Sequence, residues 1–146
     1  MSSAKARETS LWTWLRKGGK SLEPGLHMTR IENLVGEGTP DVEGFYNYKQ
    51  FWCELKAVAQ PAKPTTLIDC ELRTEQLRWH RRRYLAGCEN TWILIQVGSG
   101  INCKRFLINN LHIKALRGKV SLKHLEAMSA LPFRSNARKL LIRMAK

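Results

Sequence analysis

The chain contains 146 residues, of which 43% are hydrophobic and 25% are charged, a composition that indicates a globular protein and excludes extended disorder. The 25 Lys and Arg residues outnumber the 12 Asp and Glu residues and give a net charge of +13, which favours a polyanionic partner. No apolar run is long enough for a transmembrane helix, and the N-terminal residues lack the apolar segment of a signal peptide. We therefore expect one domain over residues 1–146, no membrane partner and a cytoplasmic location.

The predicted elements begin with two helices. Leu11 and Leu15 recur at helical spacing and predict a short amphipathic helix over residues 8–17, which a pair of glycines then ends. A second helix is predicted over residues 26–34, with Pro24 near its start.

Two strands are predicted next. Residues 36–41 are rich in turn formers and should separate the second helix from the strands. Aromatic and branched residues predict strands over residues 42–48 and 50–58. The proline-bearing segment over residues 59–66 suits neither a strand nor a helix, so we expect a loop there.

The second half of the chain continues with a helix and two strands. A helix is predicted over residues 74–86, with Thr74 as its N-cap. The nearly continuous apolar run over residues 91–97 is typical of a strand buried on both faces. A further strand is predicted over residues 103–108, after a glycine-bearing turn.

The remainder, over residues 110–146, is predicted to be helical and basic. Ser121 is the expected N-cap of one helix, and Pro132 should interrupt the helical region. The whole order of helices and strands predicts an α/β protein built around one central sheet.

The cysteines and histidines give no sign of a zinc site. No two cysteines have the CxxC spacing, and the histidines are scattered. We expect the thiols to be reduced and to lie in the core. The four cysteines are Cys53, Cys70, Cys88 and Cys103.

The positive charge is concentrated in the second half of the chain. Residues 1–66 carry 9 basic and 7 acidic side chains, whereas residues 67–146 carry 16 basic and 5 acidic side chains. This asymmetry favours a nucleic-acid-binding surface in the second half. The arginines predicted to contact DNA lie on one helix: Arg78, Arg81, Arg82 and Arg83.

One group of residues suits metal-dependent phosphodiester chemistry. In the strand over residues 50–58, Glu54 and Lys56 project from one face, and Leu55 projects from the other. If the two predicted strands pair, Asp41 approaches the strand that bears Glu54. Two carboxylates, with the backbone carbonyl of Leu55, are ligands of the kind that Mg²⁺ prefers, and Lys56 could offset charge in the transition state.

These residues carry a resemblance to a nuclease family. Asp41 after a proline, followed by Glu54-x-Lys56 on a strand, resembles the PD-(D/E)XK motif, and Gly38 and Gln76 are similar to its virus-type replication-repair (VRR-NUC) branch. That branch includes phage enzymes similar to Holliday-junction resolvases. The resemblance covers residues 28–97 and implies a restriction-endonuclease-like core, in which helices flank a central mixed β-sheet.

The resemblance also implies further site residues. In such families the first helix often carries an acid that completes the metal site, and Glu32 is the matching residue, with Glu37 as its competitor. Gln76 matches the glutamine near the start of the helix after the motif, which places it in the catalytic site.

The sequence therefore predicts a Mg²⁺-dependent DNA endonuclease, in which Mn²⁺ can substitute. Branched DNA is the expected substrate, in DNA recombination or repair, and a phage-encoded enzyme would act in the host cytoplasm. Because a junction needs two symmetric nicks, we expect a homodimer. Two alternatives remain open at this point: a nuclease of the same fold that acts on other DNA, and a non-catalytic basic DNA-binding protein.

Overall fold

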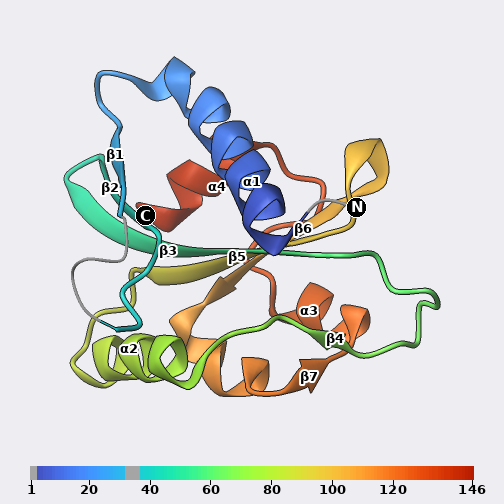
Figure 1. Ribbon diagram of the computed structural model, residues 1–146. Helices are drawn as coiled ribbons and strands as arrows, with labels where there is room; N and C mark the ends of the chain where they lie inside the picture. The colour runs from blue at the N-terminus through green and yellow to red at the C-terminus, as the bar shows by residue number, and fades with distance from the viewer. Residues whose placement is uncertain (1–2, 32–36) are drawn as a thin grey trace.

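The computed structural model describes residues 3–31 and 37–146 and has a five-stranded central sheet with helices on both faces (Figure 1). The strands are β1 (His27–Arg30), β2 (Val42–Tyr46), β3 (Lys49–Val58), β4 (Ile68–Asp69), β5 (Thr91–Val97), β6 (Lys104–Asn109) and β7 (Lys119–Val120). The helices are α1 (Ala4–Gly19), α2 (Thr74–Leu85), α3 (Leu122–Met128) and α4 (Ala137–Met144), with 3₁₀ helices η1 (Lys20–Leu22), η2 (Gly100–Asn102) and η3 (Asn110–Leu116).

The central sheet is mixed and has the strand order β1-β2-β3-β5-β6. Strands β1, β2 and β3 pair antiparallel, β3 pairs parallel with β5, and β5 pairs antiparallel with β6. The parallel step needs a crossover, and α2 lies within that connection. The short strands β4 and β7 form a separate two-stranded sheet. The predicted class, α/β with a central mixed sheet flanked by helices, is confirmed.

Each face of the sheet carries its own apolar cluster. On one face, Leu55 and Leu94 of the sheet belong to a buried cluster with Leu11 of α1 and Leu141 of α4. Residues of the opposite face, Ile93 and Ile95 among them, form a second buried cluster with side chains of η3, α3, β4 and β7. Figure 1 shows α1 and α4 on one side of the sheet and α2 and α3 on the other.

The helix predicted over residues 26–34 is wrong, because residues 27–30 form β1. This segment pairs with β2, with Met28 opposite Gly44 and Arg30 opposite Val42. A segment this short gains little from helix propensity, so pairing with a neighbouring strand decides its conformation.

The other predicted elements of the first half are confirmed, with shifted ends. The first helix is longer than predicted and begins after Ser3, whose hydroxyl accepts a hydrogen bond from the Ala6 amide. Strands β2 and β3 meet at a two-residue turn, where Asn47 and Tyr48 both have positive φ angles of 54° and 65°. This is the conformation that a tight hairpin requires.

In the second half, β5 has the predicted bounds and β6 begins one residue later than predicted. Thr74 is the first residue of α2, and the N-cap is Arg73, which corrects the predicted cap. Ser121 caps α3 as predicted, since its Oγ accepts a hydrogen bond from the His124 amide over 3.0 Å. The region after residue 110 is not entirely helical, because it contains β7.

Three of the four cysteines predicted to lie in the core are buried. None of the four cysteines forms a disulfide, and all except the half-buried Cys88 are buried. No helix in the described part of the chain is both long and apolar enough to cross a membrane.

Candidate active site

Strand β3 continues beyond the end of its antiparallel neighbour β2. The last register pair between the two strands joins Val42 and Cys53, and β3 then runs on to Val58 in parallel pairing with β5. Backbone groups on the β2 side of this extension need partners from outside the sheet. Those partners bring most of the candidate site residues together.

Asp41 is the first of these partners. Its Oδ2 accepts a hydrogen bond from the backbone N–H of Leu55 over 2.9 Å. The backbone carbonyl of Asp41 in turn accepts a hydrogen bond from the Ile31 amide over 2.6 Å. Because the N–H and C=O of one strand residue point to the same side, the Leu55 carbonyl lies on the same edge as Asp41.

Helix α1 supplies the next partner along this edge. The Nε of Arg7 donates a hydrogen bond to the carbonyl oxygen of Ala57 over 3.1 Å. The adjacent residue, Glu8, is half-buried and lines a cleft of about 730 Å³ together with Asp41 and Gln76. Partial burial raises the pKa of Glu8, against the lowering effect of the Lys56 ammonium.

Glu54 is buried, with only 1% of its surface exposed. Its Oε1 accepts a hydrogen bond from Nε2 of Gln76 over 2.8 Å, whereas its Oε2 has no hydrogen-bond partner among the described residues. Burial, reinforced by the Asp41 carboxylate, raises the pKa of Glu54 well above its usual value. The side chain is therefore arranged to take up a proton or a cation at Oε2.

Lys56 supplies positive charge to the same group. It follows Glu54 by two residues on β3, so both side chains lie on the face opposite Leu55, and it is 8% exposed. Its ammonium lowers the pKa values of both Glu8 and Glu54 against the effect of their burial. The structure thus brings Asp41, Glu54, Lys56 and Gln76 together, as the sequence predicts.

Gly38 allows the turn before Asp41 to lie against α2. Its φ angle is +85°, and a Cβ atom at this position would overlap the backbone carbonyl of Glu75 in the first turn of the helix. Glycine accepts the positive φ angle and, because it has no Cβ atom, also the close approach of the helix backbone. The close approach brings the Asp41 turn to the helix that carries Gln76.

The donor set fits Mg²⁺ better than a metal held by protein ligands alone. Among the described residues, no three His, Cys, Asp or Glu side chains are grouped as ligands for one ion. Mg²⁺ usually takes one or two carboxylates and completes its shell with waters and substrate phosphate. Asp41, the Leu55 carbonyl and the unpartnered Oε2 of Glu54 could form such a set.

A further acid, Glu8, lies at the cleft and was not singled out from the sequence. Glu32 lies outside the described residues, and Glu37 is exposed and lines a different cavity, beside Arg82. The first helix of the fold is α1, so the acid on that helix that reaches the cleft is Glu8. The sequence contained one signal for Glu8, because it is the only acidic residue before Glu23 and lies in the first predicted helix.

The four arginines of α2 separate into two groups. Arg78, Arg81 and Arg82 line a groove between α2 and η3. Arg83 instead packs over Trp79, with its guanidinium carbon 4.5 Å from the ring centroid. It also lies 5.6 Å from the ring centroid of Trp52, which contacts Trp79 edge-on at 5.4 Å.

Comparisons with known proteins find similar solved structures but no match by sequence. The chain matches no protein-family model and no curated protein sequence. Among solved structures, it is similar to Hjc, a Holliday junction resolvase from the archaeal hyperthermophile Archaeoglobus fulgidus. The two chains share 13% sequence identity with a TM-score of 0.49, over 94% of this chain and 97% of that chain.

Proposed function

We propose that this chain is a metal-dependent nuclease of the PD-(D/E)XK superfamily that hydrolyses phosphodiester bonds in DNA. The observation that carries the proposal is the buried Glu54 carboxylate, whose Oε2 has no partner, beside Asp41 at an open strand edge. Two charged carboxylates this close oppose folding, and the repulsion is relieved when Glu54 takes up a proton or when a cation binds between the two acids. A module that only binds DNA gains nothing from this arrangement.

Each residue has a role that its position supports. Asp41, Glu54 and the Leu55 carbonyl would hold Mg²⁺, which supplies Lewis acidity and lowers the pKa of a bound water. Glu8, which is half-buried and lines the same cleft, can accept a hydrogen bond from a water beside the substrate phosphate. Lys56 balances the negative charge that develops on the phosphate, since its ammonium already acts on both neighbouring carboxylates.

We further propose branched DNA as the substrate and a homodimer as the active form. The support is the resemblance of Gly38, Asp41, Glu54-x-Lys56 and Gln76 to the VRR-NUC branch. A junction is resolved by two symmetric nicks, and a twofold dimer presents two equivalent sites. Mn²⁺ should replace Mg²⁺, because both take oxygen ligands.

The test is a cleavage assay on a four-way junction and on a linear duplex that contains the same arm sequences. Each DNA is incubated with the purified chain in Mg²⁺, in Mn²⁺ or in EDTA, with Asp41→Asn as the matched inactive control. We expect cleavage only with metal and only by the parent protein, with the junction cut faster. If a folded, DNA-binding parent cuts neither substrate with either metal, the chain is a binding protein. Equal cleavage of both substrates would assign the nuclease to other DNA.

A further inference from the structure

A groove of about 690 Å³ lies between α2 and η3, away from the candidate active site. It has an apolar floor made by Leu72, Leu77 and Ile113. Its other lining residues are Thr74, Arg78, Arg81, Arg82, Lys114, Arg117 and Gly118. We call this feature the α2–η3 groove.

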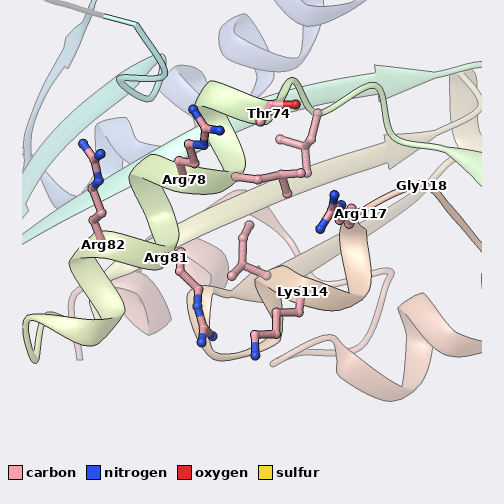
Figure 2. A pocket seen from close by; sticks show the side chains of 10 residues that line it. Thr74, Arg78, Arg81, Arg82, Lys114, Arg117 and Gly118 are labelled. Atoms are coloured by element: carbon pink, nitrogen blue, oxygen red, sulfur yellow. The ribbon is translucent and has the colours of Figure 1, made fainter.

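The charge of the α2–η3 groove has one sign. Five of its lining side chains are cationic, three from α2 and two from η3 or the residue that follows it, and no carboxylate belongs to the lining. Figure 2 shows Arg81 directed toward Lys114, with Arg82 and Arg117 toward opposite ends of the groove. The carboxylates of Glu37 and Glu75 lie in the adjoining cavity that Arg78 and Arg82 also line, so the groove itself favours a partner with several negative charges.

The shape of the groove favours a nucleic acid backbone over a small anion. Arg78 and Arg82 are one helical turn apart along α2, a rise of about 6 Å, and Lys114 and Arg117 lie on the facing segment. One phosphate could not engage cations spread along two elements. No aromatic side chain lines the groove, so bases have no surface on which to stack, and contact with sugar and phosphate is expected.

The groove and the active site share α2 but lie on different sides of it. Gln76 is buried and turns toward Glu54 of the sheet, whereas Arg78 and Arg82 are exposed. Thr74, at the start of the helix, already belongs to the groove. DNA that presents one phosphate to the site can therefore place another part of its backbone along the outer side of the same helix.

We infer that the α2–η3 groove is a second nucleic-acid-binding site, which holds the phosphate backbone of the substrate away from the bond that is cut. The inference rests on the proposed function for the identity of the substrate as DNA. The inference also assigns Lys114 and Arg117, which were not among the predicted DNA contacts, to DNA binding.

The test measures binding without cleavage. A fluorescent duplex of about 20 base pairs and a four-way junction are titrated in EDTA with Asp41→Asn protein, from about 50 to about 200 mM salt. The groove variant carries Arg81→Ala and Lys114→Ala in that background. The control variant carries Lys17→Ala and Lys20→Ala, which remove the same charge from exposed positions outside the groove.

We expect the groove variant to bind both DNAs at least about tenfold more weakly at low salt. Its plot of log affinity against log salt should be shallower by about 1.8, or about 0.9 for each lost phosphate contact. The control variant should keep the slope of the Asp41→Asn protein. A groove variant that matches the control in affinity and slope would overturn the inference, and would leave an acidic protein as the partner for this surface.

A second measurement separates this inference from the proposed function. With Asp41 restored, the groove variant should cleave saturating DNA at the parent rate with a raised KM, because the groove binds without touching the reacting phosphate. Loss of binding in the groove variant, with no cleavage by the parent, would uphold the groove and reject the nuclease. Cleavage by the parent, with unchanged binding in the groove variant, would uphold the nuclease and reject the groove as a DNA-binding site.

Discussion

The side chain of Gln76 joins the start of α2 to Glu54. Its Nε2 donates to Oε1 of Glu54 over 2.8 Å, and its Oε1 accepts a hydrogen bond from the backbone N–H of Arg73 over 2.9 Å. Both ends of the amide are therefore used, so it cannot rotate without losing a hydrogen bond. This arrangement holds one oxygen of Glu54 and leaves the other without a partner.

Replacement of Gln76 should affect both stability and catalysis. Gln76→Ala leaves the buried Glu54 without its hydrogen bond, which should lower the free energy of unfolding by about 1–3 kcal/mol. Cleavage should slow because Glu54 is no longer oriented, but less than when Glu54 itself is replaced. Denaturant unfolding and single-turnover cleavage measure the two effects. An unchanged rate would restrict Gln76 to capping the helix.

Replacement of either carboxylate at the strand edge should abolish cleavage without loss of the fold. Asp41→Asn and Glu54→Gln keep the shapes of the side chains and remove the charge that holds the metal. We expect the rate to fall by about 10³-fold or more, since metal chemistry supplies several kcal/mol. DNA binding in EDTA should stay the same or tighten, because a negative charge near the phosphates is lost. Parent-like cleavage by both variants would show that the site is elsewhere.

Glu8 and Glu32 are competing candidates for the third acid, and matched variants distinguish them. Because Glu8 lines the cleft with Asp41 and Gln76, Glu8→Gln should slow cleavage by about 10–100-fold, as for a group that positions a water. Glu32→Gln is the matched variant and should have the smaller effect. The measurement is the cleavage rate at saturating DNA and Mg²⁺. The reverse order of the two rates would restore Glu32 as the acid that the family resemblance implies.

His80 should make the protein sensitive to acid. It is fully buried, its Nδ1 lies 2.9 Å from Oγ1 of Thr91, and burial lowers its pKa to about 3. Between about pH 6.5 and about pH 3 the unfolded chain binds a proton that the folded chain excludes, so stability falls as the pH falls. Each pH unit in this window should cost up to about 1.4 kcal/mol.

The comparison of parent protein with His80→Gln isolates this effect from other titrating groups. The difference in unfolding free energy between the two proteins should shrink or reverse as the pH is lowered, because glutamine does not titrate. Denaturant unfolding at a series of pH values measures it. A difference that does not depend on pH would mean that His80 is protonated in the folded protein.

Arg83 should contribute to stability, in contrast to its neighbour Arg82. Its guanidinium lies over Trp79 and near Trp52, so Arg83→Ala should lower the unfolding free energy by about 0.5–2 kcal/mol. Arg82 is exposed in the α2–η3 groove, so Arg82→Ala should leave stability within about 0.5 kcal/mol and weaken DNA binding. Unfolding and DNA titration are measured on both variants. Equal stabilities would show that the contacts of Arg83 with Trp79 and Trp52 do not stabilise the fold.

The sequence was sufficient for the parts of this protein that depend on local pattern. Strand β5 is buried along its whole length and almost entirely apolar because both of its faces are covered, so its limits could be read from the run itself. The alternation around Leu55 likewise predicted that Glu54 and Lys56 share a face, because the side-chain period of a strand is two. The order of Asp41, Glu54 and Lys56 is the basis of the metal-dependent chemistry that we propose.

Tertiary structure decided what depends on contacts between distant segments. Residues 27–30 became a strand because β2 offered a partner, and folding placed Glu8 of α1 at the cleft that Asp41 also lines. Glu8 reaches the site because Arg7 bonds to Ala57, 50 residues away along the chain. The α2–η3 groove likewise needs two segments that the chain brings together only on folding. Local periodicity carries no information about such pairings, since it records which face of an element is buried but not which segment covers it.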